Sequence, residues 1–172
     1  MNKIKCFLML SGYQITWLSC VLGEVFYKSF IPGLLFGFIF LLIGFFYTNY
    51  KKNFVLILLS ISIPGYLFDS ILVYFKVYNF NTSHYLGLLP IWMLVLWPSF
   101  ASLFNEVFTF LYEYKLSAVF FGSVLGPLTY YSGYPLGLIN INQFYLFFLF
   151  MIFFWGMLMI CYLNYLIKFK FD

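Results

Sequence analysis

The stretch FVLILLSISIPGYLFDSILVYFKV, residues 54–77, decides the fold class of this chain. Apart from Asp69 and the Lys near its end, it is almost wholly apolar. A spanning helix needs about 20 mostly apolar residues, because the hydrocarbon core is roughly 30 Å thick and each residue adds about 1.5 Å. A transmembrane strand would alternate polar and apolar residues over about 10 positions, and this run does not alternate. The stretch therefore predicts a transmembrane helix.

Five further apolar runs of similar length surround this one. They cover residues 6–26, 31–47, 89–111, 116–134 and 143–167. The composition agrees, because 65% of the residues are hydrophobic and 8% are charged, whereas a soluble domain carries about 25% charged residues. We therefore expect residues 1–172 to form one domain, an all-α integral membrane protein with a six-helix transmembrane bundle.

The lysines predict how this bundle is oriented. Seven of them fall on one side of the predicted spans, at positions 3, 5, 51, 52, 115, 168 and 170, and only Lys28 and Lys76 fall on the other. Cytoplasmic loops carry the excess of basic residues, so both termini are expected in the cytoplasm. The net charge of +4 forms no basic stripe, which argues against nucleic-acid binding.

The residue types that most catalytic and metal sites require are scarce. The chain has no Arg, a single His and three Cys. These numbers allow no multi-histidine metal site, no cysteine pair motif and no Ser-His-Asp arrangement. We expect no metal, no cofactor and no catalytic residue, and we expect the three cysteines to be packing residues inside spans.

The predicted outer half of the membrane contains one acid whose neighbours can be named. Counted along the helices from the cytoplasmic end, Asp69 lies at about 23 Å, Trp97 at about 22 Å and Tyr130 at about 21 Å. An acid inside a span costs roughly 2.5–3.5 kcal/mol and usually has a partner. We expect the Asp69 carboxylate to accept hydrogen bonds from Tyr130, Trp97 or Ser70. Whether it bridges helices or serves a ligand or a proton is open.

The remaining polar residues of the spans suggest structural roles. Glu24 is expected to pair with Lys28, four residues later on the same helix. Asn105 and Glu106 lie in the inner third of the fourth span, and Gln14 lies at a similar depth, so we expect a hydrogen-bonded cluster there. Together with Asp69, Ser70, Ser123 and Tyr130, they give the first, third, fourth and fifth spans their polar side chains. Those four spans are therefore expected at the centre, with residues 31–47 and 143–167 peripheral.

Three prolines fall near one level of the bilayer. Pro64, Pro98 and Pro127 lie at about 16 to 20 Å from the cytoplasmic end, and each frees the carbonyl four residues earlier. Irregular backbone at this depth lines a cavity in many transporters. The alternative is three ordinary kinks, because proline is common in spanning helices.

Four motifs in order resemble a known family. They are Trp17-x-x-Cys20-x-x-Gly23, Asp69-Ser70, Pro90-x-Trp92-x-x-x-x-Trp97-x-x-Phe100 and Gly126-Pro127-x-x-Tyr130-x-x-Gly133-x-x-Leu136-Gly137. The pattern is similar to the bacterial inner-membrane proteins of domain-of-unknown-function family 2878, over nearly the whole chain. The resemblance implies a multi-pass protein of the cell inner membrane with no established activity. Relatives tend to be encoded near lipid-modifying enzymes, which implies membrane lipids and lipid-modifying proteins as partners.

Two hypotheses of different class follow from these observations. The candidate pocket in both consists of Asp69, Ser70, Trp97 and Tyr130, with Pro127 below. In the first, the protein is a non-catalytic membrane partner of lipid modification that holds a lipid or apolar metabolite. In the second, it is a small transporter or flippase-like carrier in which Asp69 titrates, and a chain of this size would then be expected to form an oligomer.

Overall fold

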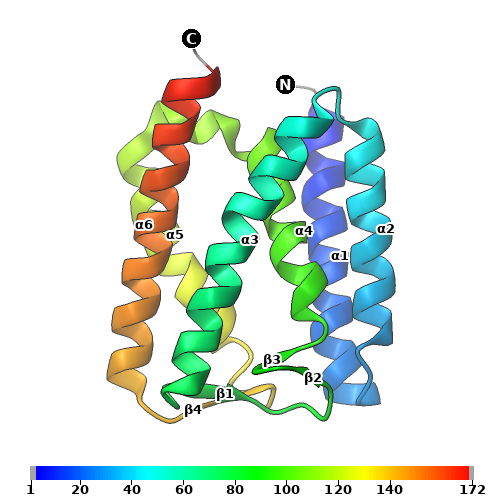
Figure 1. Cartoon of the computed structure of the whole chain (residues 1–172), viewed down its shortest axis with the longest axis vertical. Coiled ribbons are helices and arrows are strands. Elements are labelled where there is room, and N and C mark those ends of the chain that lie inside the picture. Colours follow the sequence, from blue (N-terminus) through cyan, green and yellow to red (C-terminus); the bar gives the residue numbers. More distant parts are fainter. Residues whose placement is uncertain (1–2, 171–172) are drawn as a thin grey trace.

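The computed structural model describes residues 3–170, apart from the side chains at positions 3, 106 and 166–170. Within that range the chain forms six α-helices, one 3-10 helix and four short strands (Figure 1). The helices are α1 (Lys3–Tyr27), α2 (Ile31–Tyr47), α3 (Lys51–Tyr74), α4 (Met93–Glu106), η1 (Phe108–Tyr114), α5 (Lys115–Tyr131) and α6 (Phe144–Lys170). The strands are β1 (Tyr78–Phe80), β2 (Tyr85–Leu86), β3 (Leu89–Pro90) and β4 (Ile139–Ile141).

The helices lie side by side as an elongated bundle. The start of α1 and the end of α6 lie at the same end, which we call the termini end, and the strands lie at the opposite end, the strand end (Figure 1). The principal packing partners are α1 with α2, α3 with α4, and α5 with α6, while α4 also packs against α1 and α2. The predicted central position of the fourth span is therefore confirmed.

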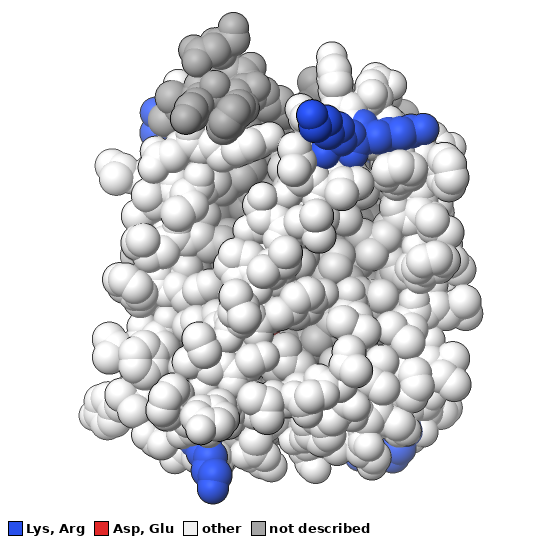
Figure 2. Space-filling model, in the orientation of Figure 1, with Lys and Arg blue, Asp and Glu red and all other residues white. Residues whose placement is uncertain are grey.

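Three helices, α1, α3 and α6, are each long and apolar enough to cross a membrane. A fourth candidate is the pair formed by α4 and the helical segment that follows it, which bends by 59° at the break after Asn105. The apolar helix α2 is shorter, with 17 residues. The face shown in Figure 2 has its lysines at the two ends and a broad uncharged band between them. The chain is thus a helical protein with three to four helices suited to a membrane.

The strands at the strand end were not expected from the sequence. β1 pairs with β4 in antiparallel register, with Tyr78 opposite Ile141, and β2 pairs with β3. The third span, predicted to reach position 77, therefore ends at Tyr74, and the fourth, predicted from 89, begins at Met93. The reversal after α3 includes Lys76 with a φ of 55°, a left-handed conformation that ends a helix. The fourth and fifth predicted spans also end early, at Glu106 and Tyr131.

The predicted peripheral position of residues 143–167 is wrong. Helix α6 packs against α3, α5 and η1, and it buries Phe147, Met151, Trp155 and Met159 along one face. Helix α5, which was expected at the centre, packs mainly against α6 and η1. A helix that is apolar on every side gives no periodic signal for its buried face. The prediction used only the lack of polar residues in this helix, and that lack does not distinguish a peripheral helix from a packed one.

The three prolines lie inside α3, α4 and α5 as expected. Pro98 cannot donate to the Leu94 carbonyl, and the Tyr66 hydroxyl on α3 donates to that oxygen instead, at 3.0 Å. This hydrogen bond connects α4 to α3, its principal neighbour. The carbonyl that Pro98 leaves without its helical donor therefore has a protein partner.

Candidate functional site

The Asp69 carboxylate is the polar centre of the bundle. It is fully buried, and its Oδ2 accepts hydrogen bonds from the Trp97 indole and the Tyr130 hydroxyl, each at 2.8 Å. Its Oδ1 accepts a hydrogen bond from the Tyr78 hydroxyl at 2.7 Å. The expected contacts of Trp97 and Tyr130 with Asp69 are confirmed, whereas the half-buried Ser70 makes no described hydrogen bond to it. The carboxylate joins α3, α4, α5 and β1 at one point.

Tyr78 is the donor that sequence reasoning missed. It lies on β1, outside the candidate spans, and it is fully buried. Burial, and then the neighbouring Asp69 charge, raise the pKa of the Tyr78 phenol well above its usual value. The phenol therefore keeps its proton and stays a donor to the carboxylate. Its only sequence signal is a position nine residues after Asp69, and this becomes informative only once the β1–β4 pairing is known.

Two stacked indoles continue this centre across the bundle. The rings of Trp97 and Trp155 have centroids 5.6 Å apart and an interplanar angle of 19°. A Cβ added to Gly65 on α3 would lie 2.5 Å from the Trp97 ring, and one added to Gly126 on α5 would lie 2.2 Å from the Trp155 ring. These two glycines leave the room that the stacked rings fill between α3 and α5.

A cavity of about 60 Å³, which we call the outer cavity, lies against this stack. All four tryptophans of the chain line it. They are Trp17 on α1, Trp92 just before α4, Trp97 on α4 and Trp155 on α6, joined by Tyr13, Phe80, Phe100 and Tyr130. None of its lining side chains is charged, and Asp69 is not among them. Trp97 and Tyr130 therefore form part of the cavity wall, and the carboxylate that they bind does not itself line the cavity.

The indole N–H groups of this wall differ in their hydrogen bonding. Trp97 donates its ring N–H to Asp69, but the ring nitrogens of Trp92 and Trp155 are buried and have no acceptor among the described residues. Both side chains are more than nine-tenths buried, with 2% and 6% of their surface exposed. A buried donor without an acceptor costs free energy, and each of these two nitrogens exposes less than 1 Å², so neither presents its N–H to the cavity.

A larger apolar hollow, the inner groove, lies beside the outer cavity. Its volume is about 390 Å³, and it shares Tyr13, Phe100, Thr129 and Trp155 with the outer cavity. Its other walls come from η1, α5 and α6, and include Leu111, Phe121, Leu125 and Met159. Ligand pockets usually enclose about 300–1,000 Å³, so the inner groove has that size and the outer cavity alone does not.

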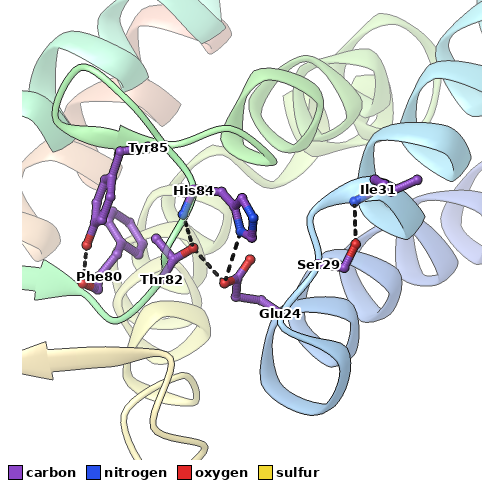
Figure 3. Close-up of polar contacts among 7 residues, drawn as sticks. All are labelled: Glu24, Ser29, Ile31, Phe80, Thr82, His84 and Tyr85. Carbon is purple, nitrogen blue, oxygen red and sulfur yellow. Dashed lines mark hydrogen bonds and ion pairs between the residues drawn. The ribbon is translucent and has the colours of Figure 1, made fainter.

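The expected Glu24–Lys28 pair is wrong. Glu24 is 1% exposed, and its Oε1 accepts a hydrogen bond from the Thr82 hydroxyl at 2.6 Å, as Figure 3 shows. The His84 Nδ1 lies 4.0 Å from the same oxygen. Helix α1 ends at Tyr27, and Lys28 takes a φ of 49°, so the helical spacing that the pairing requires is lost there.

The described residues do not show the expected cluster of Gln14, Asn105 and Glu106. Asn105 Nδ2 donates to Thr48 Oγ1 at 3.4 Å. Gln14 is exposed on α1 and has no hydrogen bond within the part of the chain that the structure describes. The side chain of Glu106 lies outside the described residues. Pro127 is buried in α5, and it lines neither the outer cavity nor the inner groove.

The chain is thus a helical protein in which three to four helices are suited to a membrane, with a buried carboxylate centre and an uncharged cavity beside it. The chain belongs to a family described as proteins of unknown function, DUF2878, whose model matches residues 7–161. The family resemblance noted from the sequence motifs is thereby confirmed. Comparison with curated proteins and with solved structures gives no match.

Proposed function

We propose that this protein is a multi-pass protein of the cell inner membrane that binds a lipid or apolar metabolite without chemically changing it. The binding site is the outer cavity together with the inner groove. The protein then acts as a non-catalytic partner of lipid modification, with membrane lipids and lipid-modifying proteins as its neighbours. The proposed role beside lipid-modifying proteins rests on the family resemblance, and the proposed binding site rests on the geometry of the two hollows.

The proposed topology has six spans and cytoplasmic termini. Lys51 and Lys52 begin α3 and Lys115 begins α5, so these three lysines belong to the termini end. At the strand end, Lys28 and Lys76 follow α1 and α3. The positive-inside rule then favours the termini end as the cytoplasmic one.

The observation that carries the binding function is the position of all four tryptophans around one uncharged cavity. Aromatic side chains spread for membrane anchoring would lie at the two ends of the bundle. The four tryptophans instead line a cavity that shares part of its wall with an apolar groove, and the groove is large enough for a lipid chain. The Asp69 hydrogen bonds hold two of the wall residues in place, which is the usual way to pre-organise a site.

A carrier with Asp69 as the titrating group is the weaker hypothesis. Asp69 is fully buried, accepts three hydrogen bonds and does not line the cavity. The proline level, proposed as a hinge, has its Leu94 carbonyl bound by Tyr66 across the α3–α4 contact. Both features favour a protein with one fixed conformation over a carrier that alternates between two conformations.

Lipid analysis of the purified protein tests the proposed binding. The full chain is extracted in native nanodiscs, transferred to mild detergent and examined by native mass spectrometry. Thr129→Phe fills the junction of the two hollows, because Thr129 is exposed and lines both. Leu128→Phe is the matched control, since Leu128 is 46% exposed on the same helix and lines neither hollow.

We expect the wild type and Leu128→Phe to retain an apolar ligand at a stoichiometry of about one molecule per chain. Thr129→Phe should lose it several-fold while melting at the same temperature. Retention by a folded Thr129→Phe variant would contradict the proposal, as would a wild type that carries no ligand. If vesicles that contain the protein show a proton-coupled flux that Asp69→Asn abolishes, the carrier hypothesis would replace the binding proposal.

A further inference from the structure

A third hollow lies at the corner where η1 passes into α5. Residues 112–117 line it, and its volume is about 300 Å³. We call it the end hollow, because this corner lies at the termini end of the bundle (Figure 1). Tyr114 and Ser117 line both the end hollow and the inner groove. The two hollows therefore share part of their walls, with one at the end of the bundle and the other along α5.

The end hollow has charged side chains in its wall, unlike the outer cavity and the inner groove. Glu113 and Lys115 both line it, and both are exposed. Neither side chain has an ion pair or a hydrogen bond within the described part of the chain. The Lys115 Nζ lies 4.5 Å from the centre of the Tyr112 ring, which also lines the hollow. The end hollow thus offers a ligand one positive and one negative group.

The inner groove has the length and the opening that one lipid chain requires. Ser117, Phe121, Leu125 and Thr129 line it, and their four-residue spacing places them along one face of α5. From Ser117 to Thr129 the helix rises about 18 Å, and one leaflet of hydrocarbon is roughly 15 Å thick. Phe121 and Leu125 expose 55% and 56% of their surface, so the groove is open along one side. A lipid chain can therefore enter it from the surrounding leaflet.

The two charges of the end hollow select among lipid headgroups. The Lys115 ammonium attracts a phosphate and can donate charge-assisted hydrogen bonds to it. The Glu113 carboxylate repels a headgroup that carries only negative charge, and it attracts a cationic group. A primary ammonium can donate hydrogen bonds to this carboxylate, whereas a quaternary ammonium has no N–H to donate. The hollow is therefore complementary to a headgroup with one phosphate and one primary ammonium.

We propose that the protein binds one zwitterionic phospholipid with a primary ammonium group, the chemistry of phosphatidylethanolamine, from the leaflet at the termini end. Its phosphate lies beside Lys115 and its ammonium beside Glu113, while one acyl chain occupies the inner groove and points toward the outer cavity. The second chain stays in the bilayer along the open side of the groove. The inference rests on the proposed function, and it adds the ligand class and the two residues that select the headgroup.

Lipid titration of the full-length protein tests this selection. The protein is delipidated in mild detergent, and native mass spectrometry then measures its affinity for three phospholipids with identical acyl chains. These are phosphatidylethanolamine, phosphatidylcholine and phosphatidylglycerol. Glu113→Gln and Lys115→Gln each remove one charge from the end hollow. Lys52→Gln is the matched control, because Lys52 is an exposed lysine at the start of α3, also at the termini end, and does not line the end hollow.

We expect the wild type to bind phosphatidylethanolamine about fivefold more tightly than either other lipid, the scale of one charge near a membrane surface. Lys115→Gln should weaken all three lipids by a similar factor, because all three carry a phosphate. Glu113→Gln should bind the three lipids alike, and Lys52→Gln should behave as the wild type. A wild type without this preference, a preference that survives in Glu113→Gln, or equal affinities in Lys115→Gln and Lys52→Gln would overturn the inference.

The Thr129→Phe variant separates this inference from the proposed function. It blocks the far end of the groove, so it should weaken all three lipids and keep the preference for phosphatidylethanolamine. If it weakens them while Glu113→Gln leaves the preference unchanged, the groove binds a lipid and the headgroup assignment is wrong. If it changes no affinity, the chain does not lie in the groove and the proposed binding site is wrong as well. The melting temperature of each variant shows whether a lost affinity comes from a lost fold.

Discussion

Asp69 and Glu24 are both buried carboxylates, with 0% and 1% of their surface exposed, but their surroundings differ. Asp69 accepts hydrogen bonds from three side chains on three different elements. Glu24 accepts one, from Thr82, and its Oε2 has no hydrogen-bond partner within the described chain. The Asp69 region holds helices together, whereas the Glu24 region connects one helix end to the loop before β2.

The difference shows that burial alone does not make an acidic side chain important for stability. A buried charge becomes structural when its donors come from separate elements, because its removal then leaves several partners unpaired at once. An acid with one donor and an unpartnered oxygen offsets little of its own desolvation cost. The comparison therefore predicts large effects around Asp69 and small ones around Glu24.

Asp69→Asn should have the largest effect. The amide must direct an N–H toward one of the three donors, so the hydrogen bonds to Trp97, Tyr130 and Tyr78 cannot all persist. We expect the free energy of unfolding to fall by about 3–5 kcal/mol, as when one partner of a buried charged group is removed. Unfolding by denaturant in mild detergent, followed by circular dichroism, measures it. A loss below about 1 kcal/mol would show that Asp69 does not hold these helices.

Tyr130→Phe removes one of the three donors and keeps the ring. The carboxylate retains Trp97 and Tyr78, so we expect a smaller loss of about 1.5–3 kcal/mol, the range for a hydrogen bond to a charged group. The same unfolding experiment measures the change. Tyr131→Phe, one residue along α5, is the matched control, because Tyr131 has no described contact with Asp69. Equal losses in the two variants would argue against the role of the Tyr130 hydroxyl.

Gly126→Ala tests the stack beside the carboxylate. The new Cβ would meet the Trp155 ring at 2.2 Å, and overpacking of this kind costs about 1–3 kcal/mol. The thermal unfolding midpoint should fall, and ligand binding should weaken, because the Trp155 ring lines both hollows. Gly44→Ala, whose Cβ would lie 3.2 Å from Phe54, should change neither by a comparable amount.

Glu24→Gln should have the smallest effect. The amide oxygen can still accept from Thr82, and the substitution removes a charge that has only one hydrogen bond. We expect a change in the free energy of unfolding of less than about 1 kcal/mol in either direction. A loss as large as that of Asp69→Asn would abolish the distinction between the two acids.

The sequence predicted the helices and two of the three Asp69 donors for a clear reason. Charges delimit apolar runs, and the depth of Trp97 and Tyr130 follows from the helical rise along each run. The third donor, Tyr78, lies beyond a reversal whose geometry depends on pairing with residues 139–141. Such pairing between segments far apart in the chain has no local signal.

The predictions that were wrong also depended on contacts between distant parts of the chain. Glu24 and Lys28 have helical spacing in the sequence, but α1 ends between them and Thr82 supplies the partner. The buried face of α6 could not be read from a helix that is apolar all round. The sequence also gave no sign that the four tryptophans line one cavity, because Trp17 and Trp155 lie far from Trp92 and Trp97 in the chain.

Tryptophan fluorescence tests the central claim most directly, because all four tryptophans line the outer cavity. The wild-type protein and the Thr129→Phe and Leu128→Phe variants are each titrated with a fatty acid methyl ester that is brominated along its chain. We expect strong quenching in the wild type and in Leu128→Phe, and much weaker quenching in Thr129→Phe. Equal quenching in the wild type and in folded Thr129→Phe, or no quenching in the wild type, would contradict the proposed binding site.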